Sequence, residues 1–127
     1  MKNATWAGRS VAQLAESFTA VGKTVPDIVG PRDIAAYEKV DSAMREIAEI
    51  LRTRGAEGDA ALVGLMDHSS VVVRARAAAA CLEISRDRAV NVLADICDLR
   101  AGKVSMDAMH ALLFAGEFDM KTGPKRR

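Results

Sequence analysis

Two histidines and two cysteines are the residues of this chain best suited to chemistry, and their spacing favours neither a catalytic site nor a metal site. His68 follows Asp67 in a polar break between two apolar runs, and His110 lies three residues after Asp107 in a helical pattern. A metal site needs three or four converging ligands, and neither histidine has another histidine one helical turn away. We therefore interpret both pairs as turn or surface residues and predict no bound metal.

Nucleophilic catalysis also lacks support in the sequence. A reactive thiol needs exposure and an electropositive neighbour, whereas Cys81 and Cys97 fall on the apolar faces of two expected helices. Ser69 and Ser70 fit a turn and a helix N-cap. The chain has no glycine-rich phosphate loop and no Gly-x-Ser-x-Gly motif. We predict a protein that is not an enzyme and carries no cofactor.

The composition is that of a globular protein with an aliphatic core. The chain has 127 residues, of which 50% are hydrophobic and 28% charged, and its formal net charge is +1. So small a charge argues against nucleic acid or an anionic membrane as the partner. The sequence shows no apolar leader and no stretch near the roughly 20 apolar residues that span a bilayer. Because two reduced cysteines fit a reducing compartment, we expect a cytoplasmic protein.

Apolar residues recur at helical spacing in six stretches, separated by turn and capping residues. The expected helices cover 10–22, 31–55, 60–67, 71–85, a stretch from Ser85 or Asp87 to about Gly102, and 105–116. Short breaks join them into about three antiparallel pairs. We expect residues 10–116 to form a single helical domain, with a frayed segment over 1–9 and a basic, disordered tail over 117–127.

A displacement of 31 residues places the apolar positions of 62–82 onto those of 93–113 without a gap. The eight matched pairs are Leu62/Leu93, Leu65/Ile96, Met66/Cys97, Val73/Val104, Ala77/Ala108, Ala78/Met109, Cys81/Leu112 and Leu82/Leu113. The match crosses two helices and the turn between them, so helical periodicity alone does not explain it. A period of about 20 to 50 residues is typical of solenoids. We predict a short α-solenoid with residues 10–55 as an atypical capping pair.

The segment 62–82 resembles a HEAT repeat, in which a leucine-rich helix and a turn containing Asp precede Val-Arg and an alanine-rich helix. The residues that carry the resemblance are Leu62, Leu65, Met66, Asp67, Val73, Arg74, Ala77, Ala78 and Leu82. His68 and Ser69 depart from the pattern, because HEAT repeats usually place Asp and Pro at these turn positions. The resemblance implies an all-α, HEAT-like or armadillo-type superhelix.

Arg74 lies at the start of the expected helix 71–85, where the helix dipole disfavours a cation. We therefore expect a carboxylate partner for this side chain. Asp67 in the preceding turn is the first candidate, and Asp98 in the neighbouring unit is the second. We interpret Asp67 and Arg74 as a structural ion pair that braces the helix pair.

A longer stretch, about 34–118, is similar to a family of small bacterial HEAT-like domains of unknown function. The similarity is carried by 34–55, 62–78 and 89–102, and the Leu-Met-Asp-His turn at 65–68 is its most specific part. This resemblance implies the fold and no activity. Binding of partner proteins and neutralisation of toxins are the functions suggested for members of such families.

In stacked helix pairs the second helix of each pair tends to line the concave face, which predicts a binding surface on 31–55, 71–85 and 105–116. The outward residues there are Arg45, Glu49, Arg52, Val72, Arg76, Glu83, Lys103, Asp107, His110 and Phe114. Val72 and Phe114 would be apolar anchors inside a charged rim. We predict a non-enzymatic protein–protein interaction module with an unidentified protein partner.

Two alternative functions remain open, a nucleic-acid-binding domain and a toxin-neutralising (immunity-type) protein. Arginines are numerous between Arg45 and Arg88, and the tail is basic. Acidic residues are interleaved with them, however, and few aromatic residues are present to stack on bases. A nucleic-acid-binding protein of this kind usually has a basic face, so we consider nucleic acid the weaker hypothesis.

Overall fold

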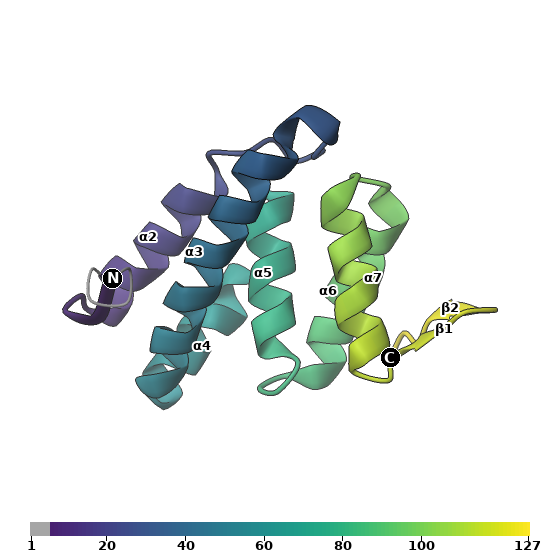
Figure 1. Cartoon of the computed structure of the whole chain (residues 1–127). Helices are drawn as coiled ribbons and strands as arrows, with labels where there is room; N and C mark the ends of the chain where they lie inside the picture. The colour runs from purple at the N-terminus through teal and green to yellow at the C-terminus, as the bar shows by residue number, and fades with distance from the viewer. Residues whose placement is uncertain (1–5) are drawn as a thin grey trace.

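A computed structural model of the chain describes residues 6–127, and these residues form an all-helical fold with one small strand pair (Figure 1). Its elements are α2 (Val11–Gly22), η1 (Pro31–Asp33), α3 (Ile34–Thr53), α4 (Ala56–Leu65), α5 (Val71–Cys81), α6 (Arg86–Leu99), α7 (Lys103–Phe114), β1 (Phe118–Asp119) and β2 (Gly123–Pro124). The all-α prediction is confirmed. The predicted fraying over 1–9 falls in part on residues 1–5, which lie outside the described residues.

Two of the expected N-caps are confirmed. The Ser10 side chain accepts a hydrogen bond from the Gln13 amide and closes a capping box with that residue, and Ser70 accepts from the Val73 amide. Each cap satisfies an amide that has no partner inside its own helix.

Helix α4 begins earlier than its sequence predicts, because the chain turns at Gly55 and resumes a helix at once. Asp59 therefore lies inside the first turn instead of capping it. Ser105 also lies within a first turn, that of α7, where its hydroxyl accepts from the Ala101 amide and donates to the Ile96 carbonyl. It joins α7 to α6 and does not cap its own helix.

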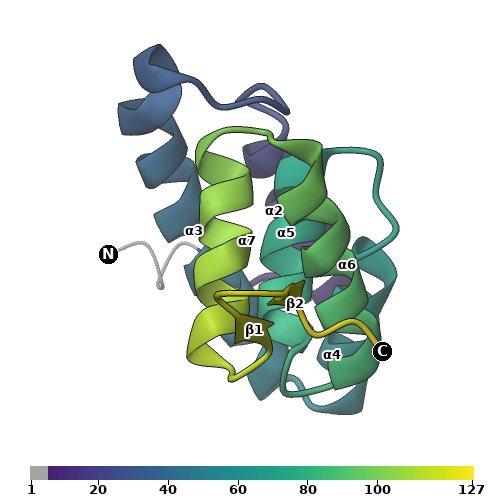
Figure 2. The ribbon, with the colours of Figure 1, turned by 90° about the vertical axis from the view of Figure 1, so that its right-hand side faces the viewer.

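Each helix from α2 to α7 packs against the next one along the chain. The two views agree in placing α3 and α7 on one side of the molecule and α4 and α6 on the other (Figures 1 and 2). Helix α5 lies between these sides and contacts α2, α3, α4, α6 and α7. Within residues 6–127, no helix has the combined length and apolar character needed to cross a membrane.

Burial partly follows the sequence match between 62–82 and 93–113. Four of the eight matched pairs are buried in both units: Leu62/Leu93, Val73/Val104, Ala77/Ala108 and Cys81/Leu112. In each of the other four pairs at least one member is partly exposed. The two helix pairs α4–α5 and α6–α7 thus contribute equivalent side chains to the core.

The connection over residues 23–30 holds the first pair against the other two. The Asp27 carboxylate accepts from the Val71 amide at the start of α5, 3.0 Å away. Val29 donates to the Ala101 carbonyl and accepts from the Lys103 amide, each at 3.2 Å. Gly102 makes this approach feasible, since its φ is +68° and a Cβ there would lie 2.2 Å from the Val29 carbonyl oxygen. These contacts place α3 opposite α7.

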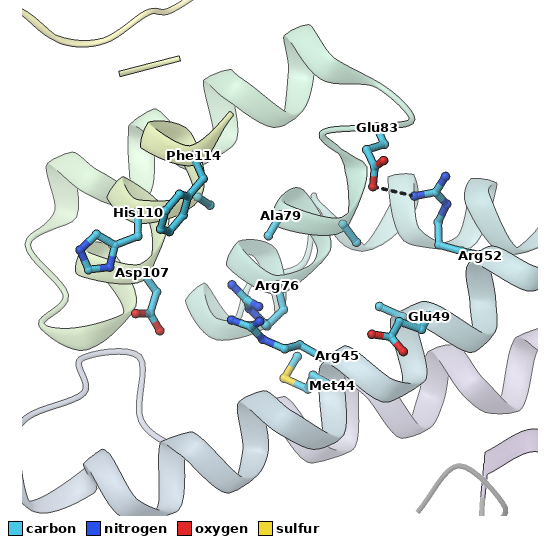
Figure 3. Close-up of a pocket in the computed structure, with 13 residues that line it drawn as sticks. Met44, Arg45, Glu49, Arg52, Arg76, Ala79, Glu83, Asp107, His110 and Phe114 are labelled. Carbon is cyan, nitrogen blue, oxygen red and sulfur yellow. Dashed lines mark ion pairs between the residues drawn. The ribbon is translucent and has the colours of Figure 1, made fainter. Parts of the chain in front are cut away.

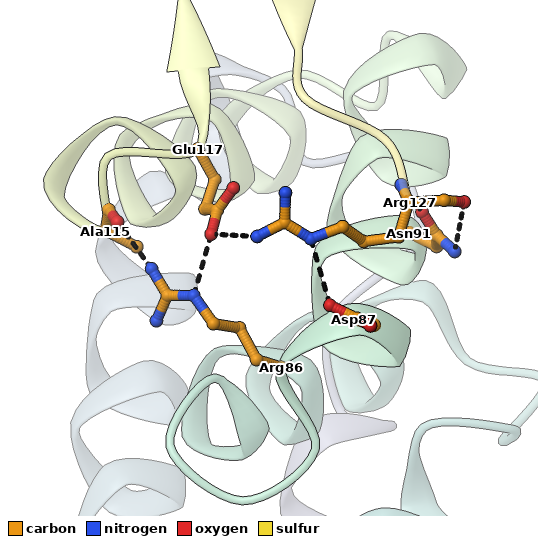
Figure 4. A network of polar contacts seen from close by, with 6 residues as sticks. All are labelled: Arg86, Asp87, Asn91, Ala115, Glu117 and Arg127. Carbon is orange, nitrogen blue, oxygen red and sulfur yellow. Dashed lines mark hydrogen bonds and ion pairs between the residues drawn. The ribbon is translucent and has the colours of Figure 1, made fainter.

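Residues 117–127 differ from the disordered tail that the sequence predicts. After α7 the chain forms the antiparallel pair β1–β2 and returns to α6. The buried Glu117 carboxylate accepts from Arg86 and Arg127, and Arg127 also bonds Asp87 and Asn91 (Figure 4). The two terminal arginines, Arg126 and Arg127, therefore have carboxylate partners on α6, which the composition of the tail alone does not reveal.

Candidate partner-binding groove

A groove of about 570 Å³ lies between α3, α5 and α7 (Figure 3). Eight of the ten candidate binding residues line it: Arg45, Glu49, Arg52, Arg76, Glu83, Asp107, His110 and Phe114. They come from segments far apart in the sequence, and the packing of the second helices brings them together. We call this feature the α3–α5–α7 groove.

Small side chains form an apolar wall in the α3–α5–α7 groove. Ala48 of α3, Ala79 and Ala80 of α5 and Ala111 of α7 line it, and each leaves space beside its methyl group. Phe114 lies at the last turn of α7 and is 89% exposed. The ring of Phe114 therefore adds exposed apolar surface to the groove lining.

Buried charges form the floor of the α3–α5–α7 groove. Arg76 is only 9% exposed, and its Nε lies 3.0 Å from Asp41 Oδ1. Neither of these two atoms makes a hydrogen bond of good geometry within residues 6–127. The other oxygen of Asp41 accepts from Arg45 Nε at 2.9 Å, and the Arg45 side chain is 61% exposed. One carboxylate is therefore shared by two guanidinium groups.

Asp107 joins α7 to α3 at one end of the groove. Its carboxylate accepts from the Tyr37 hydroxyl at 2.8 Å and contacts Lys103 Nζ at 3.0 Å. Burial of the phenol, followed by its hydrogen bond to this carboxylate, raises the pKa of Tyr37 far above its ordinary value. Tyr37 therefore stays protonated and acts as a fixed donor. Lys103 pairs with Asp107 from outside the groove lining.

Arg52 occupies the opposite end of the groove. Its guanidinium lies 3.1 Å from Asp59 and 3.6 Å from Glu83, whose side chain is 81% exposed. Glu49 is also exposed there, one helical turn from Arg45. The groove thus has carboxylates at its Arg52 end and two guanidinium groups at its centre, as Figure 3 shows.

The prediction that Val72 is an outward-facing apolar anchor is wrong. Val72 is 1% exposed and does not line the groove. The prediction assumed that α5 has one outward face, but α5 is enclosed by five other helices and is buried over most of its circumference. For the same reason Arg76 points into the floor of the groove and not into solvent.

The predicted ion pair between Asp67 and Arg74 is also wrong. Arg74 donates from Nη1 to the backbone carbonyls of His68 and Ser69, at 3.1 and 3.0 Å. Asp67 pairs instead with Arg88 of α6, and this contact holds the pKa of Asp67 below its ordinary value. Arg74 still braces the turn. The helix dipole disfavours a cation at the start of α5, and the two carbonyl oxygens before the helix compensate by accepting hydrogen bonds from the guanidinium.

The residues considered for catalysis take structural positions. Burial raises the pKa of the Cys81 thiol to about 11 and that of Cys97 above its ordinary value, so both thiols stay protonated at neutral pH. His68 Nδ1 accepts from the Ser70 amide, which orders the turn before α5. Within residues 6–127, no three side chains of His, Cys, Asp or Glu gather as metal ligands would.

Sequence reasoning missed three residues that shape the groove. They are Tyr37, Asp41 and Met44, and both Tyr37 and Met44 are core residues as well. Asp41 and Arg45 are four residues apart on α3, a spacing at which opposite charges can pair on a helix, and they form an ion pair. No local signal links Asp41 to Arg76 or Tyr37 to Asp107, because both contacts depend on helix packing.

Comparison with known proteins identifies a family. A family model described as "Domain of unknown function (DUF2019)" matches residues 12–114, which contain the helices α2 to α7 except for Val11, the first residue of α2. Neither the comparison with curated proteins nor that with solved structures found a match. The matched region contains the α3–α5–α7 groove and stops before the β1–β2 hairpin. The chain therefore belongs to the DUF2019 family, a domain of unknown function.

Proposed function

We propose that this chain is a non-enzymatic protein–protein interaction module that binds a segment of a partner protein in the α3–α5–α7 groove. The observation that carries the proposal is the convergence of eight separately predicted residues on one hollow surface. The apolar wall and the exposed ring of Phe114 fit an apolar side chain of the partner, and the surrounding charges fit polar contacts at its edge.

The arrangement of helix pairs supports a short HEAT-like solenoid as part of this proposal. The pairs follow one another along the chain, and α4–α5 and α6–α7 bury equivalent residues. In such solenoids the second helices form an extended concave surface. Toxin neutralisation would be one form of the proposed activity, in which the bound partner is a toxin.

Pairing of the basic residues weighs against the nucleic-acid alternative. Arg52, Arg86 and Arg88 each have a carboxylate partner. In the tail, Arg126 pairs with Asp95 and Asp98, and Arg127 pairs with Asp87. To bind phosphates, these arginines would first have to give up their carboxylate partners. A basic face without carboxylates could bind phosphates directly.

Replacement of Phe114 by Glu tests the proposed function. A protein captured by the full chain from the cells that make it would be purified, and its affinity measured by calorimetry. We expect Phe114→Glu to weaken binding at least about tenfold, since it places a carboxylate where an apolar contact forms. Met106→Glu is the matched control, because Met106 is also exposed on α7 but does not line the groove.

Equal losses in both variants, or an unchanged affinity for Phe114→Glu, would contradict binding in the groove. Thermal unfolding of each variant would show that the fold is retained. The same protein titrated with duplex DNA at low and at moderate salt tests the alternative, because phosphate-dominated binding falls steeply with salt.

A further inference from the structure

The centre of the α3–α5–α7 groove holds more positive than negative charge. Asp41 is the carboxylate partner of both Arg45 and Arg76, so the three side chains together carry one net positive charge. Asp107, another carboxylate of the groove lining, is already bonded to Lys103 and Tyr37. The excess is local, since Glu49 and Glu83 lie toward the Arg52 end (Figure 3).

Arg76 is buried without the hydrogen bonds that such burial requires. Its side chain is about nine-tenths buried, and its Nε has no hydrogen-bond partner within residues 6–127 although Asp41 Oδ1 is 3.0 Å away. A guanidinium has five N–H donors, and burying a charged group is unfavourable unless they are satisfied. In Figure 3 the guanidinium groups of Arg45 and Arg76 lie side by side at the floor of the groove.

We propose that Arg45 and Arg76 bind an acidic side chain of the partner protein, next to an apolar side chain that packs on the apolar wall and Phe114. A carboxylate is planar and accepts two parallel N–H bonds, so it suits a guanidinium better than a single acceptor does. The carboxylate would also balance the second positive charge of Arg45 and Arg76, because Asp41 alone balances only one. This inference rests on the proposed function and adds the chemistry of the partner.

Three small probes of one shape and different charge test this inference. They are 3-phenylpropionate, 3-phenylpropanamide and 3-phenylpropylamine, which is a cation at neutral pH. Each would be titrated into the ¹⁵N-labelled full chain, with binding followed by amide chemical shifts. We expect the carboxylate to bind at least about fivefold more tightly than the amide or the cation, with shifts centred on Arg76, Ala79 and Ala111.

Arg45→Gln is the informative variant, because Arg45 is exposed and its loss leaves the core intact. It should reduce the preference for the carboxylate over the amide at least about threefold. Arg76→Lys, which keeps the charge but not the planar fork, should also reduce it. Arg32→Gln is the matched control, an exposed arginine outside the groove lining, and it should change nothing.

Equal binding of carboxylate and amide, tighter binding of the cation, or the absence of shifts in the groove at about 20 mM probe would each overturn the inference. An Arg45→Gln variant with an unchanged preference would do so as well. These outcomes concern the charge of the bound group only. If the captured partner still binds more weakly to Phe114→Glu, the proposed function is retained and only the preference of the groove for an acidic side chain is rejected.

Discussion

Two carboxylates in this molecule are each shared by two arginines, and their surroundings differ. Glu117 accepts from Arg86 and Arg127, and those arginines also bond the Ala115 carbonyl and Asp87 (Figure 4). Asp41 contacts Arg45 and Arg76, but the contact with Arg76 lacks good hydrogen-bond geometry. The Glu117 carboxylate thus accepts hydrogen bonds from both of its arginines, whereas the Asp41 carboxylate accepts one from Arg45 only.

The position of the arginines also differs between the two clusters. The side chains of Arg86 and Arg127 are 45% and 37% exposed, so water can solvate them if Glu117 is lost. Arg76 is 9% exposed and depends on Asp41 for its only carboxylate contact among the described residues. An unpaired buried charge costs far more than an unpaired exposed one. The less well bonded cluster should therefore be the more sensitive to loss of its carboxylate.

The largest effect is expected for Asp41→Asn. This change leaves the buried Arg76 cation without a counter-charge, and we expect a loss of about 3 kcal/mol in the free energy of unfolding, measured with urea. Arg76→Met should lose less than about 1 kcal/mol, because Asp41 keeps Arg45 as its partner. Glu38→Gln, an exposed change on the same helix, is the control. Similar losses for Asp41→Asn and Arg76→Met would show that Arg76 is not a buried charge in need of a partner.

A smaller loss, about 1 to 2 kcal/mol, is expected for Glu117→Gln, since both arginines can be solvated and retain other acceptors. The β1–β2 hairpin should also loosen, because the change weakens the contact between Glu117 and Arg127, which lie on either side of the hairpin. The Lys125 amide, which donates to the Glu117 backbone carbonyl, would report this by faster hydrogen exchange, with Glu57→Gln as an exposed control. If Glu117→Gln costs more than Asp41→Asn, the comparison of the two clusters is wrong.

The Asp67–Arg88 pair gives the smallest expected effect and serves as an exposed reference for both clusters. Pairing lowers the pKa of Asp67 in the folded chain, so this pair stabilises the fold above the pKa of the unfolded chain. The contribution is lost as the pH falls through the lowered pKa. In Arg88→Gln, the pKa of Asp67 measured by NMR titration should return toward 3.8. Added salt should reduce the difference in this pKa between the variant and the wild type, because it screens the exposed pair. An unchanged pKa would show that the pair does not form in solution.

Most of the groove was predictable because helical periodicity assigns each residue to a face. Together with the expectation that the second helix of each pair lines one common surface, that argument placed Glu49, His110 and Phe114 among the residues that line the groove. It failed at Val72, since the periodicity of one helix does not show how many neighbours enclose it. It could not pair Asp67 with Arg88 either, because that contact depends on the packing of the α4–α5 turn against α6.

The tail shows a different limit of sequence reasoning. Its composition is basic and polar, which is typical of disorder. In the structure Arg126 pairs with Asp95 and Asp98, which are exposed on α6 and have no sequence relation to Arg126. Long-range charge pairing of this kind leaves no periodic signal in the sequence.

The contact of Val29 with Ala101 and Lys103 has a consequence for how the chain unfolds. In an array whose units touch only their neighbours, the ends can open separately and stability is nearly a sum of local contributions. Here the connection after the first helix is hydrogen-bonded to the turn within the last pair. Opening either end breaks contacts of the other, so the chain should unfold in one concerted transition, and the two sides of the groove should separate only when the whole fold does.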